Sequence, residues 1–236
     1  DAIRVTDMVV EIGKLAMLNP EQLKFMLGVL CNDTIAENAD IIIEDIDVTS
    51  YKYYKYRLTN TSSSYEVSDI HSFAASGDSV ASQIIDINTD SKVIPAGWGE
   101  YKNPWTGTSY TEAVIYEMHI RDWAKAFSPD NEGKFREITA ELSNSGKFAT
   151  HLKDLGITHV QILPMFDYAE KNSDTNYNWG YNPYHYNVPE GRYVDYGTDK
   201  DGTDAVLQLR EMIQAFHDNG IAVIMDVVYN HTSGNG

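Results

Sequence analysis

The distribution of apolar residues changes character near residue 113. From there on, short and nearly continuous apolar runs recur at residues 113–119, 157–163 and 221–228. Runs of this kind, without the polar alternation of a half-exposed strand, are typical of strands covered on both faces in a parallel sheet. Asp226 interrupts the third run, and a charge inside a buried strand requires a partner. The pattern therefore predicts three parallel strands.

Apolar residues at helical spacing lie between these runs. The first predicted helix ends at Gly156, and its apolar face consists of Phe148, Leu152 and Leu155. A second helix spans about residues 203–219 and ends at Gly220. Its apolar stripe consists of Val206, Leu209, Ile213 and Phe216. The order strand, helix, strand, helix, strand predicts parallel βα units and an α/β fold.

The first 110 residues are less regular. A helix is predicted after Asn19-Pro20, because an N-cap and a first-turn Pro precede apolar residues at helical spacing. Strands are predicted at residues 41–48, 51–58 and, more weakly, 80–87. Residues 95–110 are rich in Gly, Pro and Trp and read as a connector. We therefore expect a small mixed, mainly β module with its connector over residues 1–110, followed by the βα units over residues 111–236.

The second βα unit is longer than its elements require. The predicted strands begin at residues 113, 157 and 221, so the second interval is 64 residues against 44 for the first. A helix and two short loops do not need 64 residues, which indicates an insertion from Met165 to about Gly202. Long loops at the carboxyl ends of parallel strands are where such folds place function. We therefore expect the insertion to contribute to a functional site.

Charge, apolar runs and cysteine content limit the kinds of partner and surroundings that the chain can have. A net charge of −17 argues against a nucleic-acid partner, since a polyanion needs a basic surface, but it does not affect a neutral ligand such as a sugar. No apolar run reaches 18 residues, so no membrane span is expected. The single cysteine, Cys31, forms no internal disulfide. The bacterial cytoplasm and the cell surface or secreted state both fit this composition, and the location stays open.

Aromatic and amide residues are concentrated in the insertion, and polar residues follow the third strand. The run Y-N-W-G-Y-N-P at residues 177–183 suits a carbohydrate, because ring faces stack on sugar C–H faces while amides bond hydroxyls. It equally suits a rigid Tyr/Pro loop packed on the rim of the fold. Asn230 and His231 stand at the strand end, where a capping role competes with a functional one. His119 and His159 read as hydrogen-bonded core histidines, and no zinc spacing, phosphate loop or nucleophile elbow is present.

Together these motifs resemble the alpha-amylase clan of glycoside hydrolases. D-V-V-Y-N-H-T at residues 226–232 is similar to the first conserved region of that clan, and Y-N-W-G-Y-N-P followed by V-P-E-G-R-Y resembles the type I pullulanases. I-Y-E-M-H-I-R-D-W at residues 115–123 and G-I-T-H-V-Q-I-L-P at residues 156–164 are similar to the first two barrel strands of those enzymes. The resemblance covers about residues 68–236 and implies part of a TIM (β/α)8 barrel, its first three βα units.

The resemblance also implies roles for individual residues. It places Tyr181 under the sugar in the −1 subsite and makes His231 a hydrogen-bonding group that stabilises the transition state there. Asp226 matches an acidic residue that supports the surroundings of the nucleophile. Asn230 matches an asparagine that holds calcium in many alpha-amylases, so calcium is a candidate in the parent protein while no cofactor is expected otherwise. The remaining substrate-binding candidates in the aromatic run are Trp179, Asn178 and Asn182, the last standing where many relatives have Asp.

The resemblance implies a parent that hydrolyses α-1,6-glucosidic bonds in pullulan, glycogen or starch with retention. That reaction needs two carboxyls about 5–5.5 Å apart, which the clan places after later strands. We therefore expect the chain to be an inactive N-terminal part of such an enzyme, its open barrel edge prone to self-association. Another clan member, of isoamylase or branching type, is the nearest alternative. A non-catalytic α-glucan-binding module is the alternative from a different class.

Overall fold

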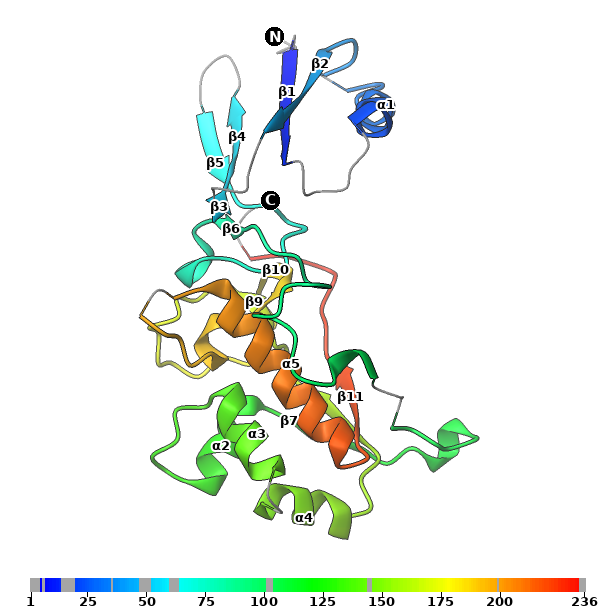
Figure 1. The fold of residues 1–236 in the computed structure, drawn as a ribbon, viewed down its shortest axis with the longest axis vertical. Helices are drawn as coiled ribbons and strands as arrows, with labels where there is room; N and C mark the ends of the chain where they lie inside the picture. The colour runs from blue at the N-terminus through cyan, green and yellow to red at the C-terminus, as the bar shows by residue number, and fades with distance from the viewer. Residues whose placement is uncertain are drawn as a thin grey trace. The chain divides into compact units, whose positions relative to one another are not determined.

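The computed structural model gives two compact units, residues 1–67 and residues 68–236, each described by itself (Figure 1). The described residues are 5, 7–13, 20–34, 36–46, 52–59, 64–100, 104–143, 146–198 and 200–233. Asn19, the predicted helix cap, and residues 47, 48 and 51 of the predicted strands lie outside them. No helix in the described part of the chain has the length and apolar character needed to cross a membrane.

The first unit contains a parallel strand pair and a hairpin. Strands β1 (Asp7–Gly13) and β2 (Asp40–Ile46) pair in parallel, and α1 (Pro20–Leu30) lies between them in the chain, as a parallel connection requires. The predicted strand at residues 51–58 is divided into β3 (Tyr53–Tyr54) and β4 (Tyr56–Thr59). Strand β4 forms an antiparallel hairpin with β5 (Ser64–Val67), which the sequence pattern does not reveal.

The second unit is built on three parallel strands. Strands β7 (Ile115–Met118), β8 (His159–Ile162) and β11 (Ala222–Met225) form a sheet in the order β11-β8-β7. All three lie within the predicted runs. Asp226 follows the end of β11, and its backbone N–H donates to the Ile162 carbonyl at 3.0 Å. Its side chain therefore stands at the carboxyl edge of the sheet and not inside the strand.

Helices cover one face of this sheet. Three helices separate β7 from β8, namely α2 (Ile120–Phe127), α3 (Phe135–Leu142) and α4 (Lys147–Asp154). Only α4 is predicted from the sequence pattern. Helix α5 (Gly202–Asp218) precedes β11, and the Asp201 side chain caps it by accepting from Thr203 N–H at 3.0 Å. Gly220 ends this segment with a φ of +76°, a conformation that glycine adopts without strain.

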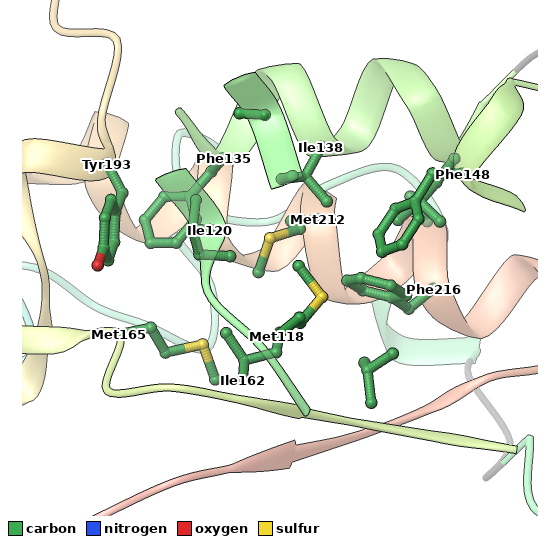
Figure 2. Close-up of a cluster of buried hydrophobic side chains, with 14 of the residues drawn as sticks. Met118, Ile120, Phe135, Ile138, Phe148, Ile162, Met165, Tyr193, Met212 and Phe216 are labelled. Carbon is green, nitrogen blue, oxygen red and sulfur yellow. The ribbon is translucent and has the colours of Figure 1, made fainter. Parts of the chain in front are cut away.

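The main core lies between these helices and the sheet (Figure 2). Phe135 and Ile138 of α3, together with Met212 and Phe216 of α5, are fully buried against strand residues such as Ile162. Burial of each such side chain contributes about 1.5–3 kcal/mol. The other face of the sheet is open at its β7 edge within the described residues: Ile115 is 54% exposed, and Glu117 on the same face is also exposed. The expectation that the strands are covered on both faces is therefore not met here.

Residues 68–100 pack with the second unit, although the sequence pattern groups them with the N-terminal module. The Arg210 guanidinium on α5 donates to the carbonyls of Ile87 and Val93 at 2.8 and 2.9 Å. Ala74 and Val93 pack with Val206 of the same helix. The segment is mostly irregular, with η2 (Gly77–Ser79), β6 (Ser82–Gln83) and η3 (Trp98–Glu100), so only β6 remains of the predicted strand at 80–87. After residues 104–109, η4 (Tyr110–Glu112) leads into β7.

Candidate functional site

The predicted insertion folds into an antiparallel hairpin. Strands β9 (Phe166–Tyr168) and β10 (Pro183–Pro189) pair with bulges, and η5 (Gly191–Tyr193) follows. Within the hairpin, His185 Nδ1 of β10 lies 2.8 Å from Asp167 Oδ2 of β9, and His185 Nε2 lies 2.7 Å from Ser68 Oγ. Burial raises the pKa of the Asp167 carboxyl, and the hydrogen bond with His185 opposes this rise. These contacts fix the hairpin that carries the aromatic run between its strands.

The aromatic run is held in a defined loop by its own amides. Gly180 has a φ of +87° and passes so close to Pro164 that a Cβ there would lie 2.9 Å from the proline Cβ. Asn178 Oδ1 accepts from Gly180 N–H at 2.7 Å, and Asn178 Nδ2 lies 3.3 Å from Asn182 Oδ1. Asn182 Nδ2 donates to both carboxylate oxygens of Glu170 at 3.1 Å. Both predicted sugar-binding amides therefore also order the loop.

Tyr181 joins this loop to the carboxyl edge of the sheet. Its hydroxyl donates to Asp226 Oδ2 at 2.6 Å, a short contact of the kind made with a charged acceptor. Gln161 Nε2 of β8 approaches the same oxygen at 3.3 Å. Burial, followed by the contact with Asp226, raises the pKa of Tyr181 to about 12. The phenol is therefore neutral at physiological pH, and its hydroxyl is held by Asp226, directly after β11, which Gln161 of β8 also contacts.

His231 connects the chain after β11 to the same loop. Its Nε2 lies 2.8 Å from the Tyr181 carbonyl, and because a carbonyl only accepts, that nitrogen carries the proton. Its Nδ1 lies 2.9 Å from Asn230 Oδ1. The Tyr186 hydroxyl donates to the His231 carbonyl at 3.1 Å. The imidazole remains exposed, so it both contacts the Tyr181 backbone and faces solvent.

An open pocket of about 540 Å³ lies on this loop and is lined by Tyr177, Asn178, Trp179, Tyr181 and Asn182. Tyr177 is 50% exposed and Trp179 is 60% exposed, so two aromatic side chains are available to a ligand. The volume lies within the range of small-molecule sites. Aromatic faces beside amide and phenol groups suit a ligand that has apolar C–H faces and hydroxyls at its rim.

The structure thus brings Tyr181, Asp226 and His231 together, although about 45 residues or more separate the first from the other two. The other predicted residues of the aromatic run line the adjoining pocket. His119 is buried and hydrogen-bonded, as predicted, and its Nε2 also contacts the carbonyl of residue 178. Asp122, in the first turn of α2, accepts from the hydroxyl of residue 177 and was not singled out from the sequence. The only signal for Asp122 was its place just after the carboxyl end of the first strand.

Asn230, beside His231, is the candidate calcium ligand of this site. Among the residues that the structure describes, no group of three or more His, Cys, Asp or Glu side chains is arranged to hold a metal ion. The Asn230 amide oxygen, the one candidate calcium ligand, is in contact with His231 Nδ1. Calcium binds six to eight oxygens, so a calcium site at Asn230 would need several further oxygen ligands beside this amide.

Comparisons with known proteins converge on one family. The family described as alpha amylase, catalytic domain, matches residues 128–235. A pullulanase of Klebsiella pneumoniae is 31% identical over 261 residues, which cover 78% of this chain and 24% of that protein. A pullulanase of Bacillus subtilis is 41% identical over 132 residues, covering 51% of this chain and 18% of that protein.

A solved structure of a pullulanase is also similar to this chain. The crystal structure of a pullulanase from Paenibacillus barengoltzii, in complex with maltohexaose and alpha-cyclodextrin, matches with a TM-score of 0.66 at 35% identity. The match covers 77% of this chain and 29% of that one. The chain thus spans about a quarter of the length of the proteins it matches.

Proposed function

The chain belongs to the alpha-amylase family, with pullulanases among its relatives, and from this premise we propose that the protein containing it is a pullulanase-type debranching enzyme. It hydrolyses α-1,6-glucosidic bonds in branched α-glucans such as pullulan, glycogen or starch. The observation that carries the proposal is the meeting of Tyr181, Asp226 and His231 at the carboxyl edge of a parallel sheet, beside an aromatic pocket. In parallel barrels that edge is the active face.

In the proposed site the Tyr181 ring packs against the sugar whose bond is cleaved. Its hydroxyl bond to Asp226 and its carbonyl bond to His231 hold the ring from both ends, so little freedom is lost when the sugar binds. The exposed His231 ring exchanges the contact of its Nδ1 with Asn230 for a hydrogen bond to the same sugar, as positive charge develops at the anomeric carbon. Trp179, with Asn178 and Asn182, contacts the neighbouring part of the glucan.

The finer architecture belongs to this proposal. The three parallel strands, with α4 and α5 as crossover helices, are the first three βα units of a (β/α)8 barrel. Residues 113–236 number about half of a typical barrel of ~250 residues. We place the nucleophilic and acid/base carboxyls in the remainder of the protein. Residues 1–236 by themselves then bind α-glucan without hydrolysing it, and no step is assigned to a metal.

The test is linkage-specific hydrolysis by the whole protein. Reducing ends should be released from pullulan, which contains α-1,6 bonds, and far more slowly from linear amylose. Proton NMR of the first product should show the α-anomer, as retention requires. Tyr181→Ala and His231→Ala should each lower kcat/KM by more than tenfold, with the exposed Tyr229→Phe as control. Equal rates on both substrates, or a β-anomeric first product, would contradict the proposal.

A further inference from the structure

His119 lies at the carboxyl end of β7, immediately before α2, and is only 6% exposed. Its Nε2 lies 3.0 Å from the carbonyl oxygen of Asn178 and 3.2 Å from the Tyr193 hydroxyl. Because the carbonyl only accepts, Nε2 carries the proton. Burial is the main cause that lowers the pKa of His119, so the ring is neutral at pH 7 with that single proton. The residue is therefore a fixed donor to the aromatic loop.

Asp122, in the first turn of α2, contacts Tyr177, the loop residue before Asn178. Its Oδ2 accepts from the Tyr177 hydroxyl at 2.9 Å. The Tyr177 ring also lies against the His119 ring, with centroids 5.1 Å apart, and the Arg121 guanidinium lies 5.8 Å from the Tyr177 centroid. The start of α2 thus contacts two consecutive loop residues: the ring and hydroxyl of Tyr177, and the backbone carbonyl of Asn178.

Hydrogen bonds within the loop link the residues that His119 and Asp122 contact to the proposed sugar site. The carbonyl that His119 holds belongs to Asn178, whose side chain accepts from Gly180 N–H. Gly180 in turn precedes Tyr181. A shift of Asn178 would therefore move both the pocket wall and the ring at the sheet edge.

We propose that His119 and Asp122 are positioning residues, which set the aromatic loop in its glucan-binding conformation before the ligand arrives. The proposal rests on the proposed function of this loop. Ordering a side chain only on binding weakens affinity, and this cost falls away when the loop is ordered beforehand. Neither residue lines the pocket, so their effect on the ligand is exerted through Asn178 and Tyr177.

The test is calorimetric titration of the 236-residue chain with maltohexaose. Tyr177→Phe and Asp122→Ala each remove one hydrogen bond at the surface, and each should raise the Kd about fivefold, the effect of about 1 kcal/mol. The double variant should be no weaker than either alone. His119→Ala should weaken binding more, whereas His119→Gln, which keeps an N–H donor, should bind within about twofold of wild type. The exposed Asp130→Ala is the matched control.

Two further measurements separate positioning from stability. Hydrogen exchange of the peptide over residues 176–183, without ligand, should be faster in Asp122→Ala and His119→Ala and unchanged in His119→Gln. The urea midpoint of Asp122→Ala should match that of wild type. Wild-type affinity in Asp122→Ala, Tyr177→Phe and His119→Ala would overturn the positioning roles alone. Failure of the wild-type chain to bind maltohexaose would instead overturn the proposed function of the loop, and the positioning roles with it.

Discussion

Replacement of Tyr181 by Phe removes one hydroxyl from the site and leaves the ring. The hydroxyl donates to Asp226 Oδ2 at 2.6 Å, and the only other donor described on that oxygen is Gln161 at 3.3 Å. Hydrogen bonds to charged groups contribute about 1.5–3 kcal/mol. Asp226 is only half-buried and keeps its bond to Gln161, so we expect a value near the lower end, about 1.5 kcal/mol.

Urea unfolding followed by tryptophan fluorescence measures this loss in the relevant part of the chain, because all four tryptophans (Trp98, Trp105, Trp123 and Trp179) lie in residues 68–236. The midpoint should fall while the m-value stays constant. A double-mutant cycle with Asp226→Ala should give a coupling free energy of about 1.5 kcal/mol. A Tyr181→Phe variant within 0.5 kcal/mol of wild type, or a coupling near zero, would refute the hydrogen bond as a stabilising contact.

The same contact has a defined pH dependence. The pKa of Tyr181 is raised from its ordinary value near 10 to about 12, mainly by burial and then by Asp226. The folded chain therefore holds this proton more strongly than the unfolded chain, so the stabilisation is fully present below pH 10 and is lost as the pH rises toward 12. The stability difference between wild type and Tyr181→Phe should be constant from pH 7 to 9 and shrink above pH 10. A difference that grows above pH 10 would contradict this assignment.

Other predictions follow from the fold. Gly180→Ala should lower the free energy of unfolding by at least about 1 kcal/mol more than Gly220→Ala does. Both glycines have a positive φ, but only at Gly180 would an added Cβ lie against another residue. Equal urea midpoints for the two variants would argue against this close approach. Ile115→Lys should reduce the self-association we expect through the open sheet face, seen in sedimentation velocity as a smaller mean sedimentation coefficient. Phe135→Ala in the core should cost about 3–5 kcal/mol in urea unfolding, whereas the half-exposed Phe73→Ala should cost less than 1 kcal/mol.

The periodic elements of the second unit were predictable from the sequence. The strands at β7, β8 and β11 follow continuous apolar runs, and α5 carries a full stripe at helical spacing over 17 residues. Helices α2 and α3 were missed, although α4 has the same 8 residues, because neither is followed by a glycine that marks its end, as Gly156 does after α4. Strand β10 was missed because Pro183 and Pro189 stand at its ends and bulges interrupt its pairing.

The site was predictable only in part, and for a physical reason. The resemblance selected Tyr181, Asp226 and His231, but the hydrogen bonds that join them connect segments about 45–50 residues apart and leave no local pattern. The same holds for His119 and Asn178, which are 59 residues apart. Periodicity reports which face of an element is buried, whereas contacts between loops depend on how the elements are packed together.

The proposed function requires that an α-glucan bind to the loop of residues 177–182 and to the chain after β11. Hydrogen exchange of the whole chain with and without maltohexaose tests this binding most directly, with cellohexaose, the β-linked isomer, as the control. We predict that maltohexaose slows exchange in residues 177–182 and 226–233 and that cellohexaose does not. Protection confined to other segments, such as the β4–β5 hairpin, or equal protection by both sugars, would contradict the claim.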